Sequence, residues 1–149
     1  MKGNILKIEG LNKDWNDKNN VMLHAVFQIL CDFIEKEHPE KITDFNYDKK
    51  HKDLWKEIQV LYKYWKTERL KEQKRIDKLT SIWAKKHKIK FVPSEVKFPN
   101  GKIRKCSELV TVVEAKKEWN ILNKAEQKFN SREDEMLIKL MKIRKHLWS

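Results

Sequence analysis

The feature that most constrains this chain is a stretch from about Lys50 to His87 that contains neither glycine nor proline. Large apolar residues recur in its first half at helical steps of four, three and four: Leu54, Ile58, Leu61 and Trp65. The pattern thins near Leu70 and resumes at Ile76. Two structures fit: one helix of roughly 55 Å at 1.5 Å per residue, or two helices joined near Arg69. The absence of helix breakers favours one long amphipathic helix.

Helices are also expected on both sides of this stretch. The segment from about Asn20 to Glu37 has a wide apolar surface and belongs at the centre of the core, with Asp17 or Asn20 as its cap and Pro39 after its end. We expect another helix to start at a Ser107 cap. A break near residues 130–131 would then precede a last helix, EDEMLIKLMKIRKHLW.

Two short features differ from this helical pattern. The first is the stretch KIKFVPSEVKFPNGKIRK, in which the Asn100-Gly101 pair predicts a hairpin with a two-residue type I′ turn. Pro93 and Pro99 limit this hairpin to short or edge strands. Residues 1–13 fit either a short strand or an extended arm. The predicted fold is therefore mainly α, with four or five helices around the segment 21–34 and a small β-hairpin near residue 100.

Length and composition narrow the classes of protein. The 149 residues predict a single domain spanning 1–149. The sequence contains no run of 18 uncharged apolar residues, which a membrane-spanning helix would need. No secretory signal is readable at the N-terminus. We therefore expect a cytoplasmic protein without membrane contact. Cys31 and Cys106 are too few for a disulfide framework and are expected to be reduced.

The sequence offers little for catalysis. It has no GxxxxGK[ST] loop, GxGxxG turn, GxSxG elbow, HExxH or CxxC pattern. His24 and Cys31 lie seven residues apart on one predicted helix, but without a third ligand we interpret them as a hydrogen-bonded core histidine and a buried thiol. We therefore expect no enzyme activity, no cofactor and no metal. Trp15 is interpreted as packing at a helix start, with an exposed contact as the alternative.

Positive charge is concentrated in one segment. Residues 63–105 hold 15 Lys and Arg against 4 Asp and Glu, whereas residues 1–62 hold 10 against 11 and residues 106–149 hold 9 against 7. One interpretation is a phosphate-facing helix and hairpin, with Phe91 and Phe98 either stacking on bases or sealing the hairpin. The other is compositional drift, because only five of the 34 basic residues are Arg. The candidate binding residues are Lys63, Lys66, Arg69, Lys71, Lys74, Arg75, Lys78, Lys85, Lys86, Lys88, Lys90, Lys97, Lys102, Arg104 and Lys105.

Three stretches carry a resemblance to a known group of proteins. The stretches are LHAVFQILCDFIEKE, HKDLWKEIQVLYKYWKTER and the ending EDEMLIKLMKIRKHLW. They resemble a group of uncharacterised small proteins encoded by tailed bacteriophages. Together they cover about a third of the chain. The resemblance implies a phage gene product acting in the infected cell's cytoplasm, and it transfers no catalytic residue.

Three functions follow as hypotheses. The first is a non-enzymatic phage accessory protein that binds nucleic acid or a nucleoprotein complex through residues 63–105. The second is an inhibitor that docks on a host protein, such as a defence nuclease of the CRISPR effector kind or the transcription machinery. The third is a virion or assembly component. The oligomeric state stays open, because two copies could pair through Trp83 or Trp148, whereas an isolated domain would bury the same residues internally.

Overall fold

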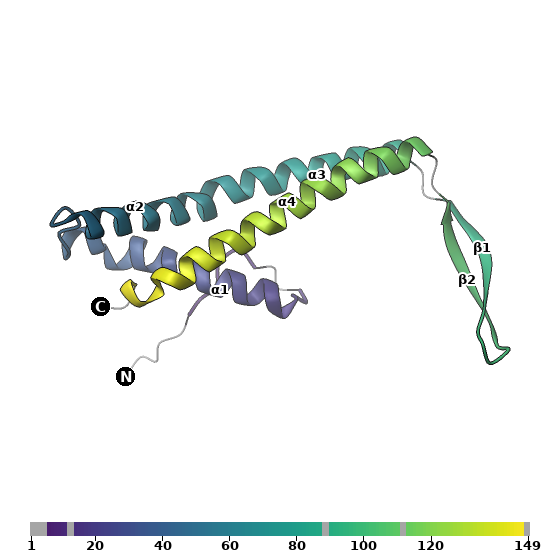
Figure 1. Ribbon diagram of the computed structural model, residues 1–149, viewed down its shortest axis with the longest axis horizontal. Coiled ribbons are helices and arrows are strands. Elements are labelled where there is room, and N and C mark those ends of the chain that lie inside the picture. Colours follow the sequence, from purple (N-terminus) through teal and green to yellow (C-terminus); the bar gives the residue numbers. More distant parts are fainter. Residues whose placement is uncertain (1–5, 12–13, 88–89, 111–112, 148–149) are drawn as a thin grey trace. The chain divides into compact units, whose positions relative to one another are not determined.

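The computed structural model describes residues 6–11, 14–87, 90–110 and 113–147. It is mainly helical, as predicted, with one small antiparallel ribbon (Figure 1). The elements are α1 (Lys18–Asp32), α2 (Lys49–Lys63), α3 (Arg69–Lys86), β1 (Lys90–Lys97), β2 (Ile103–Val110) and α4 (Val113–Ile143). The chain forms two compact units, one of residues 1–71 with 131–149 and the other of residues 72–130.

α1 begins and ends as the sequence indicates. The Asp17 carboxylate caps the helix by accepting a hydrogen bond from the Asn19 amide at 2.9 Å. A π-helical turn, Phe33–Glu37, continues α1, and His38 then takes a left-handed conformation with φ of 51° immediately before Pro39. A proline cannot extend the helix, because it lacks the amide donor and clashes with the preceding turn. The chain therefore leaves the helix at this point.

The long helix predicted between Lys50 and His87 is confirmed as one continuous helix. α2 passes directly into a π-helical turn, Tyr64–Glu68, and this passes into α3. The Arg69 amide donates to the Tyr64 carbonyl, five residues earlier, which is the hydrogen bond of a π turn. The junction considered near Arg69 is therefore a local widening of the helix, without a break.

The predicted number of helices is wrong. Within the described residues there are three continuous helices, because α4 runs without interruption through the break expected at residues 130–131. Buried Phe129 and Met136 lie seven residues apart on one side of α4, and no glycine or proline separates them, so the apolar stripe continues across the expected break. Ser107 does not cap a helix, since it pairs with Pro93 in the ribbon.

The hairpin near residue 100 is confirmed, but its predicted type I′ turn is wrong. In the turn only Gly101 has a positive φ, 79°. The Gly101 amide donates to the Phe98 carbonyl, and the Phe98 amide donates to the Lys102 carbonyl, each at 2.9 Å. The loop therefore has three residues. Pro99 explains this difference, because its fixed φ suits the first central position of an ordinary turn, after which glycine takes the left-handed position.

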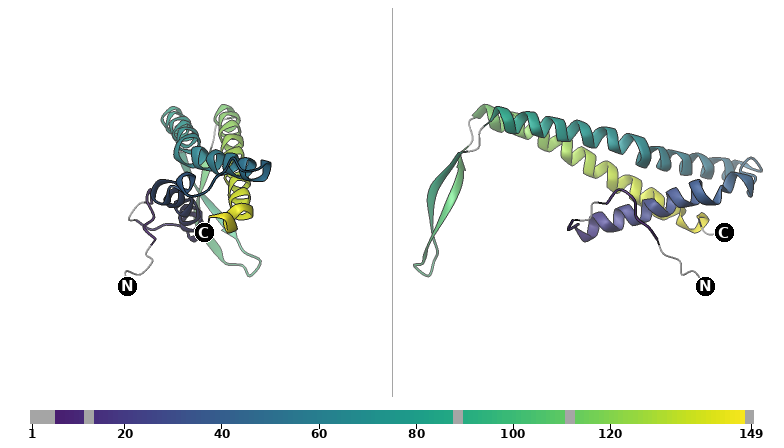
Figure 2. Two further views of the ribbon diagram at one scale, coloured as in Figure 1. Left: turned by 90° about the vertical axis from the view of Figure 1, so that its left-hand side faces the viewer. Right: turned by 180° about the vertical axis from the view of Figure 1, so that it is seen from behind.

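The core of the first unit joins α1, α2 and the C-terminal part of α4, which lie side by side in Figures 1 and 2. Its fully buried side chains are Phe27, Leu30, Ile58, Leu61, Met136 and Leu140. The segment Leu6 to Leu11 is an arm rather than a strand: the Glu9 amide donates to the side-chain oxygen of buried Gln28 at 3.0 Å. Ile5 and Trp148 lie outside the described residues.

Aromatic and charged side chains meet around Trp65. Its ring stacks on Phe27 at 4.3 Å between centroids, meets the edge of His24 at 4.9 Å, and has the Arg69 guanidinium 4.6 Å from its centre. Arg69 also forms a partly buried ion pair with Glu133 of α4. Trp15, in contrast, is 89% exposed, so the interpretation that it packs at the helix start is wrong.

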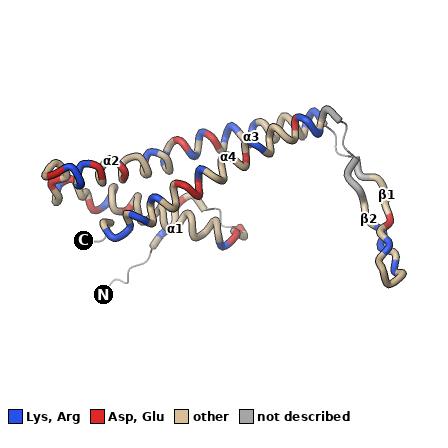
Figure 3. The backbone as a smooth tube through the Cα atoms, in the orientation of Figure 1, with Lys and Arg blue, Asp and Glu red and all other residues tan. Residues whose placement is uncertain are grey.

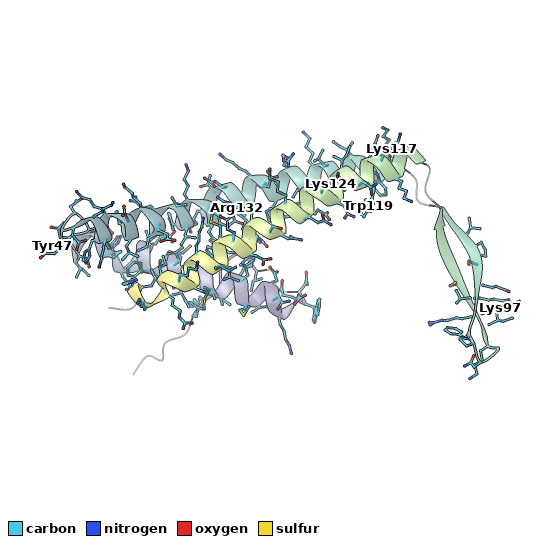
Figure 4. The ribbon with its side chains drawn as sticks, viewed as in Figure 1. Tyr47, Lys97, Lys117, Trp119, Lys124 and Arg132 are labelled. Carbon is cyan, nitrogen blue, oxygen red and sulfur yellow. The ribbon has the colours of Figure 1, made fainter. Side chains whose placement is uncertain are left out.

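We expect Phe27→Ala to lower the free energy of unfolding by about 3 to 5 kcal/mol, because the ring is fully buried and its loss leaves a cavity beside Trp65. Tyr47→Ala is the control, because this residue is 79% exposed (Figure 4) and its loss should change stability by about 0.5 kcal/mol or less. Urea unfolding followed by far-UV circular dichroism measures both. Equal effects of the two substitutions would contradict the position of Phe27 in the core.

The stability should also fall at mildly acidic pH because of His24. Burial lowers the pKa of this histidine, and the charge of Arg69 lowers it further. As the pH falls through about 6.5, the unfolded chain therefore takes up a proton that the folded protein does not bind, and the free energy of unfolding decreases. His24→Phe keeps a ring against Trp65 but cannot titrate. Urea unfolding between pH 7.5 and 5.5 should show a shallower decrease for this variant, and identical slopes would contradict the assignment.

Candidate nucleic-acid interface

In the second unit, α3 and the N-terminal part of α4 lie side by side through a small apolar core of Ile76, Leu122 and Phe129. The Trp83 indole N–H donates to the Ala115 carbonyl at 3.0 Å, and the Trp83 and Trp119 rings are 4.8 Å apart. These contacts fix which side of each helix is turned inward. The opposite sides are therefore turned to solvent.

Ion pairs near the end of α3 add to this packing. Glu118 of α4 accepts hydrogen bonds from Lys86 and from the Nε2 atom of His87, the latter at 2.8 Å. The hydrogen bond from Lys86, together with that from His87, lowers the pKa of Glu118. Lys86 therefore neutralises a neighbouring acid, and less of its charge is available to a ligand.

The solvent side of α3 carries lysines at helical spacing. Lys74, Lys78 and Lys85 are all exposed, and their separations of four and seven residues place them on one face, away from buried Ile76. In the part of the chain that the structure describes, none of the three has a carboxylate within ion-pair distance. These lysines form what we call the α3 lysine stripe.

A second stripe lies on α4 and was missed by the sequence analysis. Lys117, Lys124 and Lys128 are exposed and separated by seven and four residues, on the side of α4 turned away from the buried Leu122 and Phe129. Figure 4 labels Lys117 and Lys124. Segment counting missed them because neighbouring acids offset most of the positive charge of residues 106–149. The helical spacing of the lysines was the signal that could have revealed them.

The hairpin contributes four more basic residues. Lys97, Lys102, Arg104 and Lys105 are exposed and lie near the turn end of the ribbon (Figure 3). None of them has an ion-pair partner among the described residues. Lys88 lies outside the described residues, and Lys90 is described only by its backbone in β1.

Most of the remaining predicted residues are engaged by acids. Lys66 forms an ion pair with Glu35 at 2.7 Å, which raises the pKa of the lysine and lowers that of the glutamate. Lys63 lies 3.8 Å from Glu68, and Arg69 belongs to the Trp65 contacts of the first unit.

Arg75 is likewise engaged, because it makes two hydrogen bonds to the neighbouring Glu72, at 2.6 and 3.1 Å. Lys71 is exposed on the part of α3 that belongs to the first unit, and it has no ion-pair partner within the described ranges. The structure thus separates the predicted binding residues into two groups. Some are engaged in ion pairs with acids, and the others are exposed and available to a ligand.

An apolar hollow of about 210 Å³ lies between α3 and α4 of the second unit. It is lined by Leu79, Ile82, Trp83, Glu118, Ile121 and Leu122. Leu79, Ile82 and Ile121 are 40%, 52% and 69% exposed, so the hollow opens onto an apolar surface rather than a closed cavity. A larger and more polar hollow of about 540 Å³, lined among others by Gln73, Asp77 and Glu126, also lies between these two helices.

The residues considered for chemistry take structural positions. His24 is buried, and its Nδ1 atom has no hydrogen-bond partner among the described residues. Burial raises the pKa of the Cys31 thiol to about 11, so it is a protonated core residue at neutral pH. Cys106 is exposed on β2, with its thiol 3.5 Å from the Ser94 carbonyl. Within the described ranges, no three His, Cys, Asp or Glu side chains are placed to hold a metal ion.

Comparison of the chain with protein-family models, with curated proteins and with solved structures finds no match. None of the helices in the described part of the chain is both long enough and apolar enough to cross a lipid bilayer.

Proposed function

We propose that this protein is a non-enzymatic, phage-encoded accessory protein that binds nucleic acid, alone or in a nucleoprotein complex, through the second unit. The observation that carries the proposal is the α3 lysine stripe, Lys74, Lys78 and Lys85, which faces solvent without acidic partners in the described structure. The basic residues of the hairpin extend the same chemistry. The proposed phage origin rests on the resemblance of the opening, tryptophan-containing and C-terminal helices.

Available lysines suit phosphate binding for a physical reason. Each lysine that neutralises a phosphate releases a condensed counterion, so the binding constant falls steeply with salt. Lysines already paired with acids, such as Lys86, contribute less because the acid competes with the phosphate. The ends of the α3 stripe, Lys74 and Lys85, are 11 residues apart, about 16 Å at 1.5 Å per residue, which is long enough to follow several phosphates. No base-specific contact is implied, since lysine acts here as a point charge.

A triple substitution tests this function. Lys74→Gln, Lys78→Gln and Lys85→Gln together should reduce the slope of log K against log salt by about 3, because each lost phosphate contact removes about 0.9. Fluorescence anisotropy with labelled DNA and RNA across a salt series measures the slope. The control replaces three exposed lysines of α2, Lys50, Lys52 and Lys56, with glutamine, which changes the net charge equally. Equal slopes for the triple variant and the control would remove the support for this surface.

A second function is favoured by the apolar surface at Leu79, Ile82 and Ile121. Lys78 stands four residues before Ile82, and Lys117 stands four residues before Ile121, so each isoleucine has a lysine neighbour on its own helix face. Apolar residues bordered by lysines suit an acidic, partly apolar surface on a host protein. We propose such docking as the alternative function of this unit.

Docking on a host protein can be separated from nucleic-acid binding by substitution. Ile82→Asp with Ile121→Asp should abolish retention of one host protein from nuclease-treated lysate, because two charges would enter the apolar contact. Ile138→Asp is the matched control, since this isoleucine is 55% exposed on the part of α4 that belongs to the first unit. Retention by the control and loss by the double variant would support docking. Recovery of no protein by the wild type would reject it.

A further inference from the structure

The hairpin formed by β1 and β2 presents apolar residues to solvent along its length. Val92, Val96 and Phe98 are 47%, 46% and 43% exposed, and Ile103 is 54% exposed. A two-stranded ribbon without a covered face is only marginally stable in water. A ligand that surrounds the ribbon would therefore both cover these side chains and order the strands.

The register of the strands divides the four basic residues near the turn equally between the two faces of the hairpin. Opposed residues of an antiparallel pair share a face, and successive residues along a strand alternate. Lys97 and Lys105 therefore lie on one face, and Lys102 and Arg104 lie on the other. Glu95, opposite Lys105, reduces the positive charge of the first face but does not reverse it. A ligand that uses all four charges must have phosphates on both sides of the ribbon.

The basic residues also lie at a defined distance from the tip. The three turn residues, 99–101, carry no charge, whereas the four basic residues lie one to four residues behind them. At about 3.3 Å per residue this corresponds to roughly 3 to 13 Å behind the tip. The floor of the major groove of DNA lies about 8.5 Å below its rim. An uncharged tip on the floor would thus place the basic side chains near the phosphates of the rim.

The dimensions of a ribbon select one of the two grooves. A sheet layer with its side chains is about 10 Å thick. The major groove of B-DNA is about 12 Å wide and admits a two-stranded ribbon, whereas the minor groove is about 6 Å wide. Double-stranded RNA has a major groove too narrow for side chains to enter. A single strand or a flat acidic protein surface would contact one face of the ribbon only.

We propose that the hairpin enters the major groove of double-stranded DNA tip first, with Lys97 and Lys105 against one phosphate wall and Lys102 and Arg104 against the other. This inference rests on the proposed nucleic-acid binding and specifies its ligand as duplex DNA. The ribbon recognises the width of the groove and its two rows of phosphates, and the lysine stripes of the helices add contacts that do not depend on the groove.

Two paired substitutions in the full-length protein test the inference. One variant carries Lys97→Gln and Lys105→Gln, and the other carries Lys102→Gln and Arg104→Gln. The control carries Lys50→Gln and Lys56→Gln on α2, with the same change in net charge. Anisotropy is measured across a salt series with a DNA duplex of about two helical turns, its single strand, and an RNA duplex of the same sequence. Circular dichroism confirms that the helical content of each variant is unchanged.

Insertion into the groove predicts that both hairpin variants are affected alike on duplex DNA. Each should reduce the salt slope by about 2 and weaken binding at low salt by about tenfold or more. The control should bind as the wild type does, and the hairpin variants should differ little from the wild type on the single strand and on duplex RNA.

Other outcomes would overturn the inference in distinguishable ways. An effect of only one hairpin pair would show contact through one face. An equal effect on the single strand would show that these residues contact phosphates without needing a groove. In both cases, and if neither hairpin pair matters while the α3 lysine stripe does, the proposed nucleic-acid binding would remain. Failure of the wild type to bind any of the three ligands in a salt-dependent way would overturn both proposals.

Discussion

The contacts of Trp65 hold the first unit together. This one indole stacks on Phe27 of α1 and lies beneath the Arg69 guanidinium, and Arg69 in turn pairs with Glu133 of α4. The face of the Trp65 ring attracts the guanidinium through a cation–π interaction. The Glu133 carboxylate neutralises the Arg69 charge, which would be costly to bury without a partner. Three helices distant in sequence are thus fixed by one connected group of side chains. The π turn that contains Trp65 lies where these contacts converge.

The same pairing of acids and bases determines which charges remain for a ligand. Lys66, Arg75 and Lys86 each lie beside a glutamate, and their charges act within the protein. The lysines of the α3 stripe lie on the side of the helix turned away from the core, where no acid reaches them among the described residues. A basic segment is therefore a mixture of structural and available charges, and only the available ones are expected to give salt-dependent binding.

The parts of the fold that follow from local sequence were predictable. The capped opening helix, the continuous helix without glycine or proline, and a hairpin at Asn100 depend on neighbouring residues, and each is present. The errors arose where a weak local signal competed with packing. Ser107 resembles a helix cap but lies opposite Pro93 in the ribbon, and Trp15 resembles a helix-start contact but is exposed. Pro99 changed the turn, because a fixed negative φ preceded the glycine.

The sequence by itself determined that the chain is mainly helical, that one long helix lies near its centre, and that positive charge is concentrated in residues 63–105. These properties depend on periodicity and composition, which are local. Only the tertiary structure decided which basic residues are paired, that the side of α4 carrying Lys117, Lys124 and Lys128 is turned to solvent, and that the hairpin carries its charge on both faces. The physical reason is that pairing and exposure depend on which helix faces are turned inward and on strand register, and distant residues fix both.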